Sequence, residues 1–175
     1  DALPISSEGW VMGMPTPRKD KVASARMARP RFSVAGIVSP QRVNLAKFQP
    51  VTTDSVSGQR LASYVTDGVA GNDNLWQSDT TGPHWAQVTF PFPVEIGSAQ
   101  VFSGLDDGSA MTNFKLQYLN NTTWTDIPGG SVTSNTNVER NIVFTAPVTA
   151  TSFRVYNSAD STVRVRELAL YPDRK

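Results

Sequence analysis

The sequence predicts an all-β domain, an antiparallel β-sandwich, and three observations support this prediction. Short segments alternate apolar and polar residues with a period of two, the pattern of strands that are buried on one face. Clusters of Gly, Pro, Asn and Asp separate these segments at short spacing, as they do in sandwiches and barrels. No segment after residue 43 has the spacing of a convincing amphipathic helix.

Strands are expected at residues 84–90, 113–119, 141–145 and 151–157. In the first of them Ala86, Val88 and Phe90 share one face, and in the last Phe153 and Val155 do. Turn residues separate the strands, at Gly82-Pro83, Asp107-Gly108, Asn120-Asn121, Pro128-Gly129-Gly130 and Asn157-Ser158. Among the aromatic residues, Trp76 and Trp85 are interpreted as core packing.

The last strand, residues 163–171, contains a break in its alternation. Apolar residues occupy odd positions up to Val165 and even positions from Leu168 onward. A one-residue slip of this kind is typical of a β-bulge, which re-aims the side chains around it. We therefore expect a bulge at Arg166 and Glu167 that directs Glu167 to a specific place.

Composition divides the chain into two segments. Of its 175 residues, 39% are hydrophobic, enough for one domain with a real core, and cysteine is absent, which excludes disulfides and thiol catalysis. Residues 1–43 carry seven Lys and Arg against three acidic residues, a net charge of +4, whereas residues 44–175 carry nine against twelve, a net charge of −3. We place the boundary between an N-terminal arm and the sandwich here.

The arm, residues 1–43, is rich in proline and shows no sustained periodicity, so an extended basic segment is expected. Two apolar patches lie within it, at residues 10–14 and 32–38. Two interpretations stay open: a flexible tether to another domain, or an arm that docks on a protein partner through these patches. Nucleic acid is not expected as a partner, because the basic residues are not interleaved with aromatic ones on a folded face.

Residues 62–79, ASYVTDGVAGNDNLWQSD, gather five Asp and Asn residues around two glycines. Such a loop is either a tight connection, since Asp, Asn and Gly favour turns, or a cage of oxygen atoms for a hard cation. It is not an EF-hand, because Val69 and Gly71 stand where acidic ligands would recur and no Glu closes a twelve-residue loop.

An ordered set of short motifs runs through residues 44–171. The motifs are NLA (44–46), ASYVTDG (62–68), LWQSD (75–79), PHWAQVTF (83–90), FKLQY (114–118), TTWTDI (122–127) and RVRELALY (164–171). Their order resembles that of the factor V/VIII type C (discoidin) family and of related carbohydrate-binding modules. This resemblance implies a galactose-binding-like jelly-roll sandwich, in agreement with the predicted strands.

The same resemblance implies a structural calcium site in the loop that follows the Asp-Gly turn. The matching side chains in this sequence are Asp67, Asp73, Asn74 and Glu167, with main-chain carbonyls near Tyr64 and Asn72 as further candidates. The loop is slightly longer than is common in the family, and Asn74 stands where Thr is frequent. Its oxygen chemistry suits calcium, which would join the loop to the last strand.

Catalysis is not expected. The single histidine, His84, has no G-x-S-x-G motif to accompany it, and is interpreted as structural or superficial. The adjacent pair Asp106-Asp107 is interpreted as a turn, because two neighbouring carboxylates rarely flank one glycosidic bond.

The resemblance instead implies recognition by loops at one end of the sandwich. Candidate loops are residues 52–61, 103–112 and 157–162, and the candidate ligand-binding residues are Gln59, Arg60, Asp106, Asp107 and Asp160. Arginine can donate to sugar hydroxyls or a uronate, and aspartate can accept from hydroxyls. None of the three loops carries a cluster of large apolar residues, so membrane insertion is not expected.

Two hypotheses follow. In the first, the chain is a non-catalytic carbohydrate-binding module of a larger secreted protein, extracellular or exposed on a surface, whose calcium is structural and whose partner is a glycan or polysaccharide. In the second, it is a structural subunit of a virion, tail or filament that docks through its arm. A removed signal peptide or a longer parent polypeptide is compatible with both.

Overall fold

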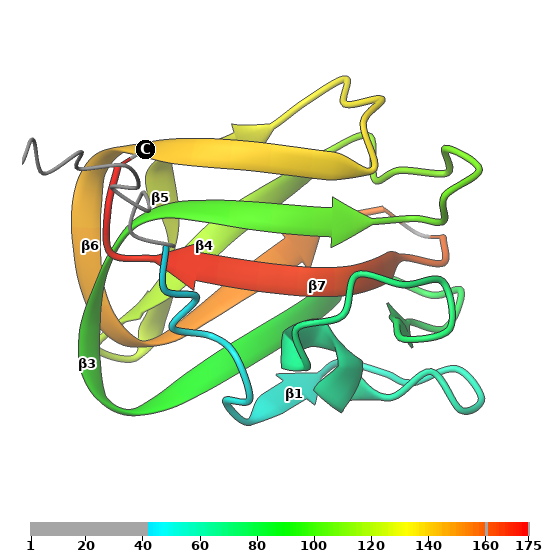
Figure 1. Ribbon diagram of the computed structural model, residues 1–175, viewed down its shortest axis with the longest axis horizontal. Coiled ribbons are helices and arrows are strands. Elements are labelled where there is room, and N and C mark those ends of the chain that lie inside the picture. Colours follow the sequence, from blue (N-terminus) through cyan, green and yellow to red (C-terminus); the bar gives the residue numbers. More distant parts are fainter. Residues whose placement is uncertain (1–41, 160, 175) are drawn as a thin grey trace, which may run out of the picture. The chain divides into compact units, whose positions relative to one another are not determined.

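The computed structural model describes residues 42–159 and 161–174 (Figure 1). The predicted arm lies, except for residues 42 and 43, outside the described residues, and so does Asp160. The elements are, in chain order, β1 (Val51–Thr53), the 3-10 helix η1 (Ala62–Thr66), β2 (Trp76–Gln77), β3 (His84–Ser103), β4 (Phe114–Asn120), β5 (Thr123–Val132), β6 (Glu139–Asn157) and β7 (Arg164–Tyr171).

All strand pairs are antiparallel, and the predicted β-sandwich is confirmed. The hydrogen-bonded order is β2-β7-β3-β6-β4-β5, with β1 paired to β3. The first part of β3 pairs with β1 and with the end of β6, and its last part pairs with β7 and with the start of β6. One layer is therefore β1-β3-β6-β4-β5 and the other is β6-β3-β7-β2.

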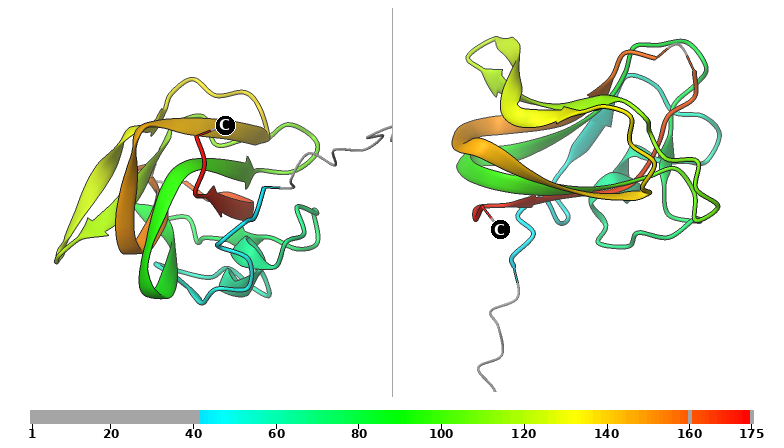
Figure 2. Two further views of the ribbon diagram at one scale, coloured as in Figure 1. Left: turned by 60° about the vertical axis from the view of Figure 1, so that its left-hand side comes forward. Right: turned by 90° about the horizontal axis from the view of Figure 1, so that it is seen from above.

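The two longest strands, β3 and β6, belong to both layers because they bend (Figure 2). Their register breaks between Thr89 and Val94 and again between Ile96 and Ser98. Prolines 91, 93 and 147 occupy these breaks, where a residue without an N–H removes no ladder hydrogen bond. The predicted strands 141–145 and 151–157 are thus the two arms of one strand, β6.

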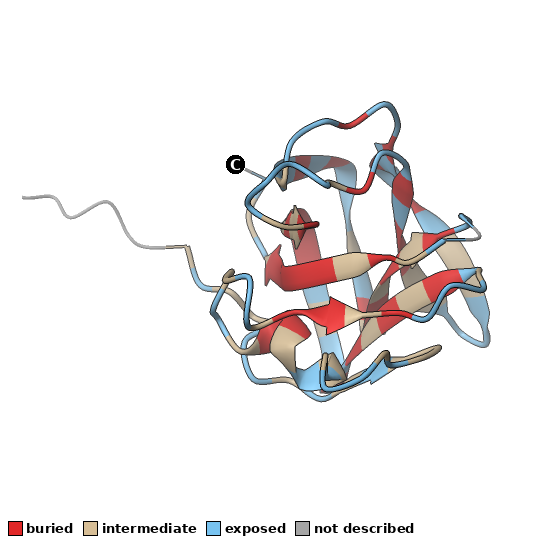
Figure 3. Ribbon diagram, turned by 90° about the vertical axis from the view of Figure 1, so that its right-hand side faces the viewer, coloured by how far each residue is buried: buried red, intermediate tan, exposed pale blue. Residues whose placement is uncertain are grey.

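The core lies between the layers and is built from the inward residues of the predicted alternation (Figure 3). Phe90 and Phe153 meet edge to face, with ring centroids 6.0 Å apart. Each fully buried residue of this size stabilises the fold by about 1.5–3 kcal/mol. Trp76 is fully buried, as expected, but the prediction for Trp85 is wrong. Its position is outward in the alternation of β3, and the side chain is half-buried on the outer face of the sheet.

The predicted bulge in the last strand is confirmed. Phe102 of β3 pairs with Glu167 of β7, whereas the next residue, Ser103, pairs with Val165, so Arg166 is the extra residue. Every residue of β7 from 165 to 170 is buried. The alternation fails here because the core covers one face of β7 while residues 44–47 and η1 cover the other.

Opposite the bends of β3 and β6, the loops that connect the strands gather at one end of the sandwich (Figure 1, right). We call this the loop end. No helix among the described residues has the length and the apolar character to cross a membrane.

Candidate functional site

Glu167 is the centre of the predicted cation site, and the bulge places it against the loop after η1. Its side chain is buried, with 4% of the residue exposed. The main-chain N–H of Gly68 donates to Oε2 at 3.1 Å, and Nδ2 of Asn44 donates to Oε1 at 3.1 Å. The last strand is thus joined to the loop by direct hydrogen bonds.

Asp67 and Asn74 close the same loop. Asp67 Oδ1 accepts from the main-chain N–H of Val69 at 2.8 Å, and its Oδ2 accepts from Asn74 Nδ2 at 2.7 Å. The fourth predicted ligand, Asp73, is exposed, and its main-chain carbonyl accepts from Arg60 Nη1 at 3.1 Å. Asp67 and Asn74 therefore lie on the inner side of the loop, next to Glu167 of β7, whereas Asp73 is exposed.

The electrostatics of this loop favour a bound cation. The pKa of Glu167 is raised to about 7, mainly by burial and also by the negative charge of Asp67, against the lowering effects of the Gly68 N–H, Asn44 and Lys47. The positive charge of Lys47 therefore compensates the two neighbouring carboxylates only in part. Carboxylate, amide and carbonyl oxygens are the donors that calcium takes, so these residues fit the ion that the resemblance implies.

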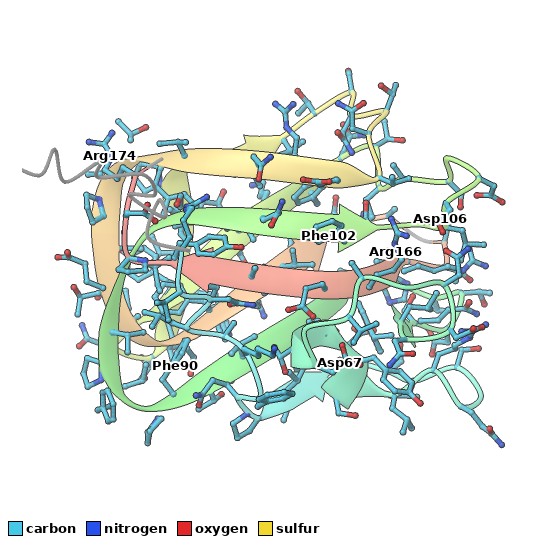
Figure 4. All side chains as sticks on the ribbon, viewed as in Figure 1. Asp67, Phe90, Phe102, Asp106, Arg166 and Arg174 are labelled. Carbon is cyan, nitrogen blue, oxygen red and sulfur yellow. The ribbon has the colours of Figure 1, made fainter. Side chains whose placement is uncertain are left out.

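Two arginines hold the carbonyl groups of the loop. Arg60 Nη1 donates to the main-chain oxygen of Asn72 at 2.8 Å, as well as to that of Asp73. Arg166, the bulged residue, is 3% exposed, and its Nη1 donates to the carbonyl of Ala70 at 3.3 Å and to the carboxylate of Asp106 (Figure 4). Arg166 was missed in the sequence because an alternating strand predicts an arginine at the surface.

The predicted ligand-binding residues lie in different surroundings. Arg60 and Asp106 are engaged in the contacts above, and the main-chain N–H of Asp106 also donates to Asn72 Oδ1 at 3.0 Å. Asp107 Oδ1 accepts from the main-chain N–H and the hydroxyl of Ser109, which closes the predicted turn. Gln59 is exposed, and Asp160 lies outside the described residues.

A hollow of about 360 Å³ opens at the loop end, between the β3–β4 loop and the β6–β7 loop; we call it the loop hollow. Its described lining consists of residues 109–113, 157–159 and 161–164. Hydroxyl and amide groups dominate this lining, and Arg164 is its one charged residue in the described part of the chain. None of the four described ligand-binding candidates is among these residues. The Ser, Thr and Asn content of both loops was the one feature of the sequence from which this polar lining could have been predicted.

Three side chains of the lining, those of Asn113, Asn157 and Arg164, are held in place by hydrogen bonds. Asn113 Oδ1 accepts from the main-chain N–H of Ser134 at 3.1 Å, and the main-chain carbonyl of Asn113 accepts from Asn157 Nδ2 at 2.9 Å. Arg164 donates through Nε to Gln77 Oε1 at 2.8 Å. These contacts hold polar groups in place before a ligand arrives, which lowers the entropic cost of binding.

His84 lies beneath the loop end, fully buried. Its Nδ1 is 2.7 Å from Asp54 Oδ2, and Asp54 Oδ1 accepts from the main-chain N–H of Trp85 at 2.7 Å. The hydroxyl of Ser55 donates to Asp54 at 2.8 Å, so this serine bonds the carboxylate and not the imidazole. That order differs from the nucleophile and base pair of a serine hydrolase.

The same cluster could ligate a metal, since one ring nitrogen of His84 and one oxygen each of Asp54 and Asp79 lie within 4.8 Å of one another. In the described residues, Asp54 bonds both Nδ1 of His84 and the main-chain N–H of Trp85, so the cluster ties the segment after β1 to the start of β3. A metal ion at this cluster would compete with these hydrogen bonds for the Asp54 carboxylate.

Comparison with known proteins gives a family match and several similar structures. The model of the F5/8 type C domain family matches residues 50–168. No curated protein sequence matches the chain. Similar solved structures include chitosan-binding module 1 of a chitosanase/glucanase from Paenibacillus sp. IK-5, at 22% identity and a TM-score of 0.64, covering 74% of this chain and 99% of that one.

Two further structures have the same fold. A fucose binding module from Streptococcus pneumoniae is 16% identical with a TM-score of 0.66, and the match covers 75% of this chain and 96% of that one. The family 32 carbohydrate-binding module of C. perfringens NanJ, in complex with galactose, is 17% identical with a TM-score of 0.61, covering 74% and 98%.

Proposed function

Because the chain belongs to the F5/8 type C (discoidin) domain family, we propose that it is a non-catalytic carbohydrate-binding domain that takes a glycan into the loop hollow. The observation that carries this proposal is the loop hollow itself. It is of the size of a small-ligand site, it lies on loops held by a rigid sandwich, and hydroxyl and amide groups line it.

The chemistry of the lining suits sugar hydroxyls. Asn113, Ser158 and Thr162 offer neutral donors and acceptors, and Arg164 adds guanidinium donors. Of the structurally similar modules, one is a chitosan-binding module, one a fucose binding module, and one is in complex with galactose. Arg164, the one charged residue in the described part of the lining, can donate to sugar hydroxyls or to a sugar carboxylate.

We also propose calcium at the loop of Asp67, Asn74 and Glu167, in a structural role. When bound there, the ion would add positive charge beside two carboxylates that Lys47 compensates only in part. The chain's own part is to hold the loop on β7, through Asn44 and the Gly68 N–H. Since this loop also contacts Asp106 through Arg166 and Asn72, its order extends to the β3–β4 loop that forms one wall of the loop hollow.

A glycan ligand agrees with an extracellular or surface location and with a module that keeps a larger protein near its polysaccharide, which raises the effective concentration. Docking of residues 1–43 on a protein partner is a separate proposal, supported by the apolar patches of the arm. Light scattering tests whether the chain self-associates, and limited proteolysis tests whether residues 1–43 are protected. A docking arm should give one of these two results, and a flexible tether neither.

The experiment for the proposed function is a glycan and polysaccharide binding screen with the full chain, in calcium and in chelator. The matched variants are Ala159→Trp, which fills the loop hollow, and Ala146→Trp, an exposed alanine near the bend of β6 at the opposite end. We expect Ala159→Trp to abolish binding and Ala146→Trp to leave it unchanged. Equal binding by both variants would place the ligand elsewhere, and no binding to a broad panel by the folded protein would refute the function.

A further inference from the structure

The outer face of the sheet β1-β3-β6-β4-β5 carries an arginine framed by three aromatic rings. The Cζ atom of Arg154 lies 4.2 Å from the ring centroid of Trp124, 5.1 Å from that of Tyr156 and 5.9 Å from that of Trp85. All four residues are half-buried. We call this group, together with Lys115, the Arg154 face.

Strand register brings these residues together from four strands. Trp85 of β3 pairs with Tyr156 of β6, and Tyr156 pairs with Lys115 of β4. Arg154, two residues before Tyr156, has the same outward parity, and Trp124 comes from the edge strand β5. Strands that are far apart in the chain thus form one continuous surface.

Hydrogen bonds fix Arg154 but leave most of its donors free. Its Nε donates to Gln117 Oε1 at 2.7 Å. The nearby carboxylate of Asp126 is satisfied by other groups, Gln117 Nε2 at 2.6 Å and Lys115 Nζ at 2.6 Å. Neither terminal NH₂ group of Arg154 makes a hydrogen bond to a described residue. The guanidinium is therefore oriented by one bond and three rings, with four N–H donors to spare.

The charge of Arg154 is incompletely compensated. Burial lowers the pKa of its guanidinium, and the electrostatic effects of Tyr156 and Asp126 only partly oppose this lowering. A half-buried cation that is held in place gains more from an incoming anion than a freely moving surface arginine does. The planar fork of a guanidinium matches the two oxygens of a carboxylate or sulfate, and aromatic rings pack against the C–H faces of a sugar ring.

The Arg154 face is continuous with the loop hollow. A small depression of about 100 Å³ is lined by Lys115 and Tyr156 together with Asn113 and Ser158. Asn113 and Ser158 also line the loop hollow. A glycan chain that enters the loop hollow can therefore continue across the depression onto the sheet.

We propose that the Arg154 face binds the anionic group, carboxylate or sulfate, of an acidic sugar, so that the domain takes an oligosaccharide chain with acidic residues. This inference rests on the proposed glycan function and adds a second contact surface and a ligand class to it. The competing interpretation is that Arg154 only braces the sheet surface through its contacts with the rings.

The test compares three probes with the full chain by titration calorimetry at physiological salt: polygalacturonate, dextran sulfate and neutral dextran. The central variant is Arg154→Lys, which keeps the charge and loses the fork, and its matched control is Arg140→Lys, an exposed arginine at the start of β6. We expect Arg154→Lys to weaken binding of an acidic polymer by at least about tenfold, because hydrogen bonds between charged groups are lost. Arg140→Lys is expected to bind like the parent chain.

Trp124→Ala provides a second variant of unchanged charge, and thermal unfolding of each variant verifies that it is folded. Unchanged binding of both acidic polymers by Arg154→Lys and Trp124→Ala would overturn the inference, since unspecific charge attraction would then explain the binding. A preference between polygalacturonate and dextran sulfate that is lost in Arg154→Lys identifies the anionic group. Neutral glycan binding that Ala159→Trp abolishes, without any binding of acidic polymers, would refute this inference and leave the proposed function intact.

Discussion

β7 and the second arm of β6 lie in different layers of the sandwich. The outward side chains of β7 are buried, whereas those of β6 are only half-buried. Outward residues of β7 are covered by residues 44–47 and by η1, so that Glu167 and Ala169 are buried. On β6, Arg154 and Tyr156 remain half-buried and reachable from solvent. The covered face thus serves the structure, including the proposed cation site, whereas the open face and the loop end are available for a ligand.

The largest expected difference in stability is between an inward residue of β7 and an outward residue of β4, the strand that pairs with the second arm of β6. Leu168→Ala on β7 removes a fully buried side chain and should lower the free energy of unfolding by about 2–5 kcal/mol. Leu119→Ala, a half-buried outward position of β4, should cost about 1 kcal/mol or less. Urea denaturation measures both losses, and equal losses would contradict the assignment of Leu168 to the core and of Leu119 to the outer face.

The next prediction concerns the pH dependence of the covered face in chelator. The pKa of Glu167 is about 7 in the folded protein and lies near 4.5 in the unfolded chain, so the folded state binds more protons between these values. The free energy of unfolding should therefore fall as pH rises from about 4.5 to 7, by about 1–3 kcal/mol.

Two comparisons control this pH series, measured by urea denaturation at pH 5, 6, 7 and 8. Glu167→Gln should remove the slope, because the amide does not titrate. Calcium should restore stability at pH 8 and have little effect at pH 5, where Glu167 is protonated. A slope that persists in Glu167→Gln would assign the titration to another group.

Asn44→Ala should cost about 2 kcal/mol on the covered face. The Nδ2 group of Asn44 donates to Glu167. Its Oδ1 accepts from the main-chain N–H groups of Ala46 and Leu170, both at 3.0 Å. Each of the three lost hydrogen bonds contributes about 0.5–1 kcal/mol. Asn72→Ala, which loses a single exposed hydrogen bond to Asp106, is the matched control and should cost about 0.5 kcal/mol. Thermal or urea unfolding that ranks Asn72 above Asn44 would contradict this prediction.

The smallest expected effect separates two glycines that share a left-handed backbone. Gly68 has a φ of 83° and Gly108 a φ of 99°, so alanine at either position should cost about 1 kcal/mol from strain. At Gly68 the new Cβ would also come within 2.6 Å of the Lys47 side chain, whereas nothing lies within 4 Å at Gly108. Unfolding measurements should therefore rank Gly68→Ala as slightly more destabilising, and the reverse order would show that Lys47 moves aside at no cost.

Several features of the site were predictable because local sequence controls them. The loop rich in Asp, Asn and Gly folds as a closed turn, since Asp67 accepts from residues two and seven positions away. The bulge was visible as a change of parity in β7. Asn44 could not be predicted as a partner of Glu167, because 123 positions separate them and an asparagine near a strand has many equivalent uses.

The sequence by itself determined the sandwich class, the inward residues of most strands, the bulge and the family, since alternation, turn residues and motif order are written along the chain. Only the tertiary structure decided that two predicted strands form the single bent strand β6, that β7 is buried on both faces, and that Arg154 lies among three rings from three strands. These features depend on strand register and on which segments cover which face, and such contacts between distant residues leave no local pattern in the sequence.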